Sequence, residues 1–403
     1  MLVNEQLGIL GLIFIIWLLI YCFILIRKRD LGEKVKVGPL YFYLRSERMV
    51  EVFSKFSQKH ERQIRFFLTI GTIVCFLLMI AAIYILLDGV LRIIVVKEKV
   101  PAVVPVIPGI TISFETFLKI IPAIVIVLFP HEYAHKIAFD IFKLRVKSIG
   151  AGMAIVFPFA FVEPDEEKFK KSKSTARLRI LAAGSFINLL TTLIFLPPVM
   201  SPQLYSQALS PYYEGPNGIL VVGIAENSPL DRYTNIKVGD VIIRVNNVPI
   251  RTIDDYIALK LEPNVNVTIC YIKSEDLLKE HPEVHCETLV TDPHPLDPSR
   301  GIIGILVRRP WPLMTFYRPK ISILPLTLPQ VLYEIINWCF ILAFSVALFN
   351  MLPIPPLDGY PYLEALMEFL GIEEKRRKML LQGISGFAFI LLAFNLIIAL
   401  VRF

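Results

Sequence analysis

Charged side chains are scarce in this chain of 403 residues. They make up 19% of the total, whereas an average soluble domain carries about a quarter. Hydrophobic residues make up 55%, and the mean hydropathy is +0.61. This scarcity of charge excludes an ordinary soluble domain and indicates a membrane protein.

Cysteine is also scarce, and five residues are too few for a disulfide scaffold. Cys22, Cys75 and Cys339 lie in apolar stretches, where we expect them to act as small apolar fillers. Cys270 and Cys286 lie in a long hydrophilic segment. The sequence is compatible with a disulfide between these two residues and also with two free thiols.

Six stretches are apolar over about the 20 residues that a helix needs to cross a bilayer. The first has no basic N-terminal region and no small-residue cleavage pattern, so we expect a retained span and not a signal peptide. The stretches are Leu7–Ile26, Phe66–Leu87, Phe117–Phe142, Ile180–Val199, Ile335–Leu352 and Ile384–Leu400.

The net charge of +7 is concentrated in two segments, Arg27–Arg65 and Lys143–Arg179. By the positive-inside rule both face the cytosol, which places the N-terminus and the hydrophilic insert of residues 201–325 outside it. These basic runs set orientation, so the expected partner is the lipid bilayer and not nucleic acid. We expect an integral protein of a prokaryotic cell membrane.

Two segments do not follow a helical pattern. Gly150–Glu167 is small, apolar and interrupted by Gly and Pro, which predicts strand or re-entrant backbone near the membrane surface. In the insert, residues Gly218–Lys260 read as strand, helical turn, tight turn, strand, loop and helix. The predicted fold class is an all-α polytopic membrane protein with about six transmembrane helices, a short membrane-associated β segment and an inserted extracytosolic α+β domain.

The insert resembles a PDZ domain over residues Gly218–Arg309. The resemblance is carried by a Ser-Pro turn at Ser228, a Val-Gly-Asp turn at Val238–Asp240, and an Asn-Asn hairpin before a helix. The longer and more polar segment Ser274–Arg300 departs from it. The resemblance implies binding of extended peptides by strand addition. The expected groove begins in the loop that contains Gly218 and Ile219.

The sequence HEYAH places His131 and His135 four residues apart, so on a helix both imidazoles project from one face. Glu132 follows the first histidine, which gives the HExxH pattern of zinc hydrolases, with the glutamate as general base. Ionisable groups at membrane depth favour a functional site over a chance match. We therefore predict a Zn²⁺ site.

A catalytic zinc site needs a third protein ligand. Asp358, at the cytosolic end of the fifth span, is the best candidate, because Pro353, Pro355 and Pro356 prevent a continuing helix and can turn it towards the histidines. A plain cytosolic Leu-Asp-Gly turn is the alternative.

Three motifs together resemble the site-2 proteases, which are intramembrane zinc metalloproteases: FPHEYAH, AAGSFINLL at Ala182–Leu190, and NMLPIPPLDG after the insert. The resemblance implies His131, His135 and Asp358 as ligands and Glu132 as base. It further implies that Asn350 steadies substrate or oxyanion. Asn188 matches a further family asparagine and is expected to contact substrate, although Ser185 stands where the family usually has Pro. Interhelical hydrogen bonds are the alternative for both asparagines.

The function expected is hydrolysis of peptide bonds in the transmembrane segments of single-span membrane proteins. The stretch from Met153 to Val162, including Ile155, is expected to offer a strand edge to the unwound substrate. Two alternatives remain. One is a membrane zinc peptidase whose third ligand is Glu364 or Glu368, and the other is a non-catalytic scaffold that binds partners through the PDZ-like domain.

These predictions divide the chain into four parts. The first is an N-terminal transmembrane pair with a basic cytosolic loop, the second and fourth form the catalytic membrane core, and the third is the PDZ-like domain. Their bounds are residues 1–113, 114–200, 201–325 and 326–403.

Overall fold

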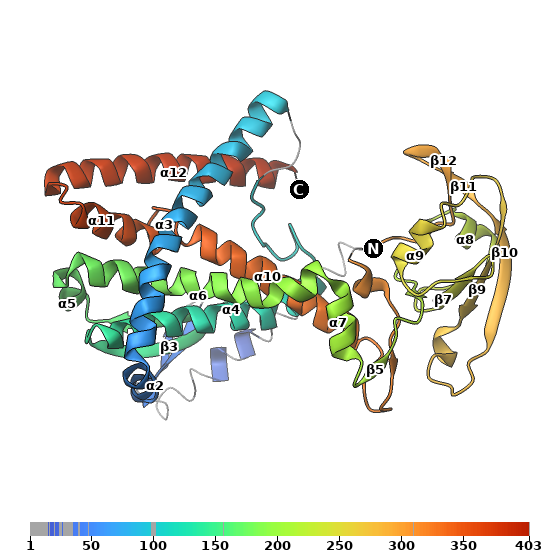
Figure 1. Cartoon of the computed structure of the whole chain (residues 1–403), viewed down its shortest axis with the longest axis horizontal. Helices are drawn as coiled ribbons and strands as arrows, with labels where there is room; N and C mark the ends of the chain where they lie inside the picture. Colours follow the sequence, from blue (N-terminus) through green and yellow to red (C-terminus); the bar gives the residue numbers. More distant parts are fainter. Residues whose placement is uncertain are drawn as a thin grey trace. The chain divides into compact units, whose positions relative to one another are not determined.

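The computed structural model describes residues 15, 17–19, 21–23, 26, 35–38, 41–46, 48–97, 102–155, 157–308 and 310–402. The chain divides into two compact units. We call Met1–Ile194 with Trp338–Phe403 the membrane unit, and Phe195–Asn337 the insert unit. Figure 1 shows the elements of each.

Five helices in the described residues are long and apolar enough to cross a membrane. Each contains most of one predicted span and extends beyond it at one or both ends. The remaining predicted span, Leu7–Ile26, lies largely outside the described residues. The five are α3 Glu61–Leu91, which continues as a π-helical turn at Arg92–Val96, α4 Phe114–Ile141, α6 Ser174–Met200, α10 Leu328–Phe349 and α12 Glu374–Arg402.

Three shorter helices with defined bounds also lie among the described residues of the membrane unit. They are α2 Arg48–Lys59, α5 Glu166–Lys171 and α11 Gly359–Phe369. The α2 helix is tied to α4 by a polar cluster, in which the fully buried Lys136 pairs with Asp140 and donates to Ser54 over 3.2 Å. A buried lysine needs such a partner, because an isolated charge in a low-dielectric interior is costly.

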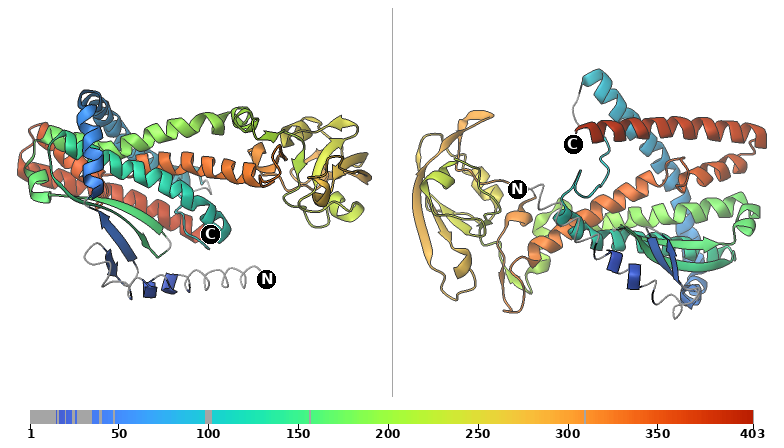
Figure 2. Two further views of the ribbon diagram at one scale, coloured as in Figure 1. Left: turned by 90° about the horizontal axis from the view of Figure 1, so that it is seen from below. Right: turned by 180° about the vertical axis from the view of Figure 1, so that it is seen from behind.

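The membrane unit also contains a four-stranded antiparallel sheet in the order β1-β2-β3-β4. Figure 2 shows it along one side of the helices of this unit. The segment predicted as strand or re-entrant backbone forms a hairpin that turns at Ile155, whose φ is +56°. Two strands from the basic segment join it, so the sheet is larger than the short β segment expected. The strands are β1 Val35–Gly38, β2 Tyr41–Ser46, β3 Val146–Ala154 and β4 Phe157–Pro164.

The order of the strands corrects the expectation that Met153 lies at a free edge. Met153 is in β3, where it pairs with Phe42 of β2 on one side and with Pro158 of β4 on the other. Both backbone edges of β3 are therefore occupied. In the part of the chain that the structure describes, β4 pairs only with β3, so β4 is the open edge beside α4.

The insert unit is built around an antiparallel sheet in the order β10-β9-β7-β6, with β8 paired to β7. The predicted Asn-Asn hairpin is confirmed, because Asn246 and Asn247 both have positive φ between β7 and β8. The sheet strands are β6 Ile219–Leu220, β7 Val241–Val245, β8 Val248–Pro249, β9 Asn266–Ile272 and β10 Val284–Val290.

Short helices and two small strand pairs surround this sheet. Cys270 and Cys286 lie directly opposite each other on β9 and β10 and form a disulfide. The helices are α7 Pro202–Leu209, α8 Pro229–Tyr233 and α9 Ile253–Ala258, with 3₁₀ turns at Ser274–Asp276 and Trp311–Met314. The further strands are β5 Tyr213–Glu214, β11 Asp292–His294, β12 Asp297–Ile302 and β13 Arg318–Pro319.

The expected peptide groove at Gly218 and Ile219 is not where the cavity of the insert unit lies. Ile219 is fully buried in β6, and Gly218 packs against the Ile242 carbonyl, so neither faces an opening. The cavity of about 480 Å³ lies instead between α9 and residues Gly301–Val307. The expected groove is wrong because the apolar residues of this segment belong to the buried strand β6.

Candidate metal centre

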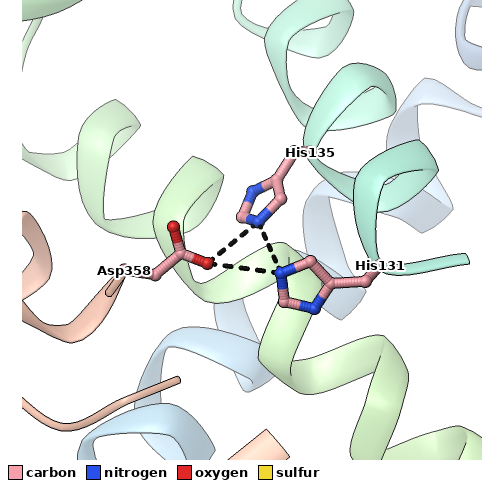
Figure 3. Close-up of side chains that lie close together, drawn as sticks. All are labelled: His131, His135 and Asp358. Carbon is pink, nitrogen blue, oxygen red and sulfur yellow. Dashed lines mark hydrogen bonds and ion pairs between the residues drawn. The ribbon is translucent and has the colours of Figure 1, made fainter. Parts of the chain in front are cut away.

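Two imidazoles face each other on one side of α4. His131 and His135 are one helical turn apart, and their Nε2 atoms are 3.3 Å from each other. Both side chains are buried, at 5% and 8% exposure. The two histidines thus lie on one face of a helix, as their spacing predicts (Figure 3).

Asp358 comes from a segment more than 200 residues further along the chain and points at the same pair. The loop after α10 closes where the Gly359 amide donates to the Asn350 carbonyl over 2.9 Å, and Asp358 sits at the start of α11. The Asp358 Oδ2 atom lies 3.0 Å from Nε2 of His135 and 3.5 Å from Nε2 of His131.

The separations among these three atoms fit a single metal ion. Ligands about 2.0–2.1 Å from a tetrahedral zinc ion are about 3.3–3.4 Å apart, and the three observed separations are 3.0, 3.3 and 3.5 Å. Gly184 of α6 leaves the space open, because a Cβ at this position would overlap both imidazoles. The donor atoms and this glycine cradle both suit a small divalent cation.

The outer nitrogens of the imidazoles are also held. His135 Nδ1 donates to the Ile180 carbonyl over 2.8 Å, which leaves Nε2 free to ligate. Asn188, which was expected to contact substrate, is instead fully buried against His131, and its amide lies 3.0 Å from His131 Nδ1. Ligation through Nε2 requires the proton on Nδ1, so the amide of Asn188 must present its oxygen to this ring.

The Asp358 carboxylate is prepared for ligation by its neighbours. Burial disfavours its ionised form, but the adjacent His135 and His131 hold its pKa below the usual range of an aspartate. Asn350 Nδ2 donates to Asp358 Oδ2 over 2.7 Å and lies 3.2 Å from His131 Nε2. Asn350 therefore steadies the carboxylate and also borders the cation position.

Glu132 lies at the wall of a cavity of about 320 Å³ that contains the three candidate ligands. The backbone N–H of Val162 donates to its carboxylate, so the glutamate lies between α4 and β4. This cavity also brings Asn350 and Pro356 beside the ligands. Its other lining residues include Phe139, Pro164, Phe169, Ile180 and Leu181.

Neither alternative glutamate ligand, Glu364 or Glu368, belongs to the described group of residues around the two histidines. Glu368 forms ion pairs with Arg177 at 2.5 Å and with Arg377 at 3.3 Å. Among the described residues, the group with metal-ligand spacing around the two histidines contains Asp358 and neither glutamate of α11. A carboxylate committed to two guanidinium groups is not available to a metal.

The remaining predicted substrate contacts lie elsewhere. Ile155 is 48% exposed at the hairpin turn of the sheet, and Met153 is in the interior strand β3. Sequence reasoning missed three groups that shape the centre: Gly184, the Ile180 carbonyl and the Val162 amide. Only Gly184 carries a signal in the sequence, because a glycine inside an apolar helix indicates a close approach.

The fold and the site define a membrane protein with a buried centre of two histidines and one carboxylate. Residues 119–393 match the model of the family described as Peptidase family M50. Because this match covers more than half of the chain, the chain belongs to peptidase family M50, a family of intramembrane metalloproteases. The resemblance to the site-2 proteases is confirmed.

Two relatives illustrate the reach of this similarity. The chain is 27% identical to an uncharacterised protein of Methanocaldococcus jannaschii over 278 residues, which are 68% of this chain and 61% of that protein. It is also 27% identical to an Arabidopsis thaliana protein named membrane-bound transcription factor site-2 protease homolog. That alignment covers 157 residues, which are 38% of this chain and 29% of the Arabidopsis protein. The chain therefore spans less than two thirds of the length of each of these relatives.

Proposed function

We propose that this protein is a zinc endopeptidase that hydrolyses peptide bonds in the transmembrane segments of single-span membrane proteins. One observation carries the proposal: Nε2 of His131, Nε2 of His135 and Oδ2 of Asp358 are spaced as the ligands of one tetrahedral ion. The predicted orientation of the spans puts the site at their cytosolic ends, where water would reach it from the polar loops.

The ion would be held by His131, His135 and Asp358. When bound, zinc supplies Lewis acidity, which activates water and polarises a carbonyl. Glu132 accepts a proton from the attacking water and delivers it to the leaving amine. Asn350, which already donates to Asp358, can donate to the carbonyl oxygen as charge develops on it.

A helical substrate must unwind before cleavage, since its carbonyls are engaged in its own hydrogen bonds. The open edge of β4 offers new partners for the unwound segment. Pro158 has no N–H to donate to β3, so its backbone faces the outer edge of β4. Because backbone groups alternate between the two edges of a strand, those of Ala160 and Val162 also face outward.

The position of Glu132 supports this docking mode. Its carboxylate accepts from the Val162 amide, which is one of the outward groups of β4. A substrate strand added along β4 would therefore pass beside the base and along the wall of the metal cavity. Strand pairing also fixes which bond is presented, because the register determines the residue beside Val162.

The insert unit would screen substrates through its PDZ-like part. Its cavity between α9 and Gly301–Val307 is mostly apolar and is bordered by the cationic Lys260 and Arg300. These features suit an extended peptide with an apolar end and a carboxylate. The Cys270–Cys286 disulfide suits the extracytosolic placement, since disulfides persist in oxidising compartments.

The test is cleavage of a defined probe by the purified full chain in phosphatidylcholine vesicles. The probe is a synthetic single-span peptide of leucine and alanine with a central Asn-Gly pair that loosens its helix. Zinc-loaded wild type should cleave it, and Glu132→Gln should bind zinc equally and lose activity about 10²–10⁴-fold. Equal cleavage by both proteins would sink the proposal, and a scaffold would show no cleavage in either.

A further inference from the structure

A second cavity adjoins the metal cavity at Glu132. Its volume is about 390 Å³, and Glu132 is the one described residue that lines both cavities. We call it the apolar cavity, because apolar atoms supply nearly all of its surface. Its other lining residues include Leu44, Phe129, Tyr133, Ala151 and Ala160.

Small side chains on one face of the sheet create this space. Ala151 and Ala160 lie directly opposite each other on β3 and β4, and Leu44 of β2 lies opposite Ala151 on its other side. Because cross-strand partners share a face, all three point towards α4. On the reverse face, the Phe161 ring occupies the place that a Cβ of Gly150 would take. One face is filled by rings, and the other is hollow beside the candidate base.

The lining decides what kind of group fits. Among the described lining residues, Glu132 is the only acidic one and none is basic. A charged occupant would have no partner of opposite charge unless it were a cation at Glu132 itself, whereas an apolar group would recover the packing that protein interiors normally have. Transmembrane segments consist largely of Leu, Ile, Val and Phe, so a substrate presents such groups at nearly every position.

Strand addition would bring substrate side chains to the two cavities in a fixed order. Val162 lines the metal cavity and Ala160 lines the apolar cavity, and both point to the same face of β4. Two residues along a strand span about 6.6 Å. A substrate side chain beside Ala160 is therefore about two residues from the bond beside Val162.

We propose that the apolar cavity is a specificity pocket that receives one large apolar side chain of the substrate, about two residues from the cleaved bond. This inference rests on the proposed protease function. The side chain enters between Ala160 and α4, and its burial holds the unwound segment in register while Glu132 acts on the neighbouring bond. The small size of Ala151 and Ala160 sets the depth of the pocket.

The experiment uses the purified full chain and the leucine-alanine probe, with leucine or alanine placed in turn at each position around the cleaved bond. A pocket for one apolar group discriminates by about 10–200-fold, so kcat/KM should favour leucine at one position by about tenfold or more. Ala151→Phe fills the cavity and should reduce this ratio to about one. Ala154→Phe, the matched control, adds the same ring to the opposite face of β3 and should keep the ratio.

A wild-type ratio in Ala151→Phe would overturn the proposal, whatever happens to the overall rate. Phe129→Ala gives a second test if the first variant fails to fold, because it enlarges the pocket and should shift the preference from leucine to phenylalanine or tryptophan; an unshifted preference contradicts the pocket. A rate that depends on lipid chain length at a constant leucine-to-alanine ratio would assign the cavity to an acyl chain instead and overturn the proposal. Cleavage without any side-chain preference removes the pocket alone, whereas absence of all cleavage removes the protease function.

Discussion

Gly184→Ala adds a single methyl group at the position where α6 contacts both imidazoles of the metal centre. A Cβ there would lie 2.5 Å from Nε2 of His131 and closer still to His135, whereas ordinary contacts are 3.4–4 Å. Both imidazoles must therefore move by about 1 Å relative to α6, and ligand distances in metal sites tolerate only about 0.2 Å.

The expected loss of zinc affinity follows from that displacement. Changes to groups that merely orient a ligand cost about 10–100-fold in affinity. Because Gly184→Ala displaces a ligand itself, we expect more than about 100-fold, which corresponds to more than about 2.8 kcal/mol. Alanine is the better helix former by about 1 kcal/mol, so the helix itself should not be weakened.

The assay is a competition titration of the purified protein against a zinc chelator, with bound zinc measured per chain. Gly383→Ala in α12 is the matched control, because a Cβ there meets no atom within 4 Å, and its zinc affinity should equal that of wild type. If Gly184→Ala binds zinc as tightly as the control, the two imidazoles do not converge beneath α6 as described.

Two further outcomes are expected in the membrane unit and one in the insert unit. Ala160→Pro removes an outward N–H of β4 and should lower cleavage while zinc content stays unchanged; wild-type cleavage rates would refute strand addition. Asn188→Ala should weaken zinc binding about 10–100-fold through the orientation of His131, as a chelator titration can measure; unchanged affinity would mean that the amide does not orient this ring. Partial burial raises the pKa of Glu287, but hydrogen bonds from the Asn235 amides and the Tyr271 hydroxyl lower it further than burial raises it. The ionised carboxylate therefore stabilises the fold above its unfolded pKa of about 4.3, and this stabilisation is lost as the pH falls below that value. Hydrogen exchange of β9 and β10 in the full chain should therefore be faster in Glu287→Gln than in wild type at neutral pH and equal at low pH; a constant difference would contradict this.

Local patterns in the sequence are sufficient to predict the long helices and the two histidines of the site. The spacing of His131 and His135 fixes their common face once the helix is known, and α4 follows from apolar length. The partnership with Asp358 rested on the conjunction of motifs, since proximity across more than 200 residues has no local signal.

The sheet of the membrane unit was harder to predict, because strand pairing is non-local. Tyr41–Ser46 lies within a basic segment of the sequence, yet it pairs with β3 and occupies the edge expected to be free at Met153. In the insert, the apolar residues around Ile219 are equally compatible with a core strand and with a binding edge, and the structure has the core strand. Both errors concern which neighbour a strand finds.

Zinc K-edge X-ray absorption of the purified, zinc-loaded chain measures the ligand shell of the ion directly. We expect two imidazole nitrogens and oxygen ligands at about 2.0–2.1 Å, with no sulfur, and loss of this shell in Asp358→Ala. A shell with fewer than two imidazoles, or one that is unchanged in Asp358→Ala, would contradict the shared centre of His131, His135 and Asp358.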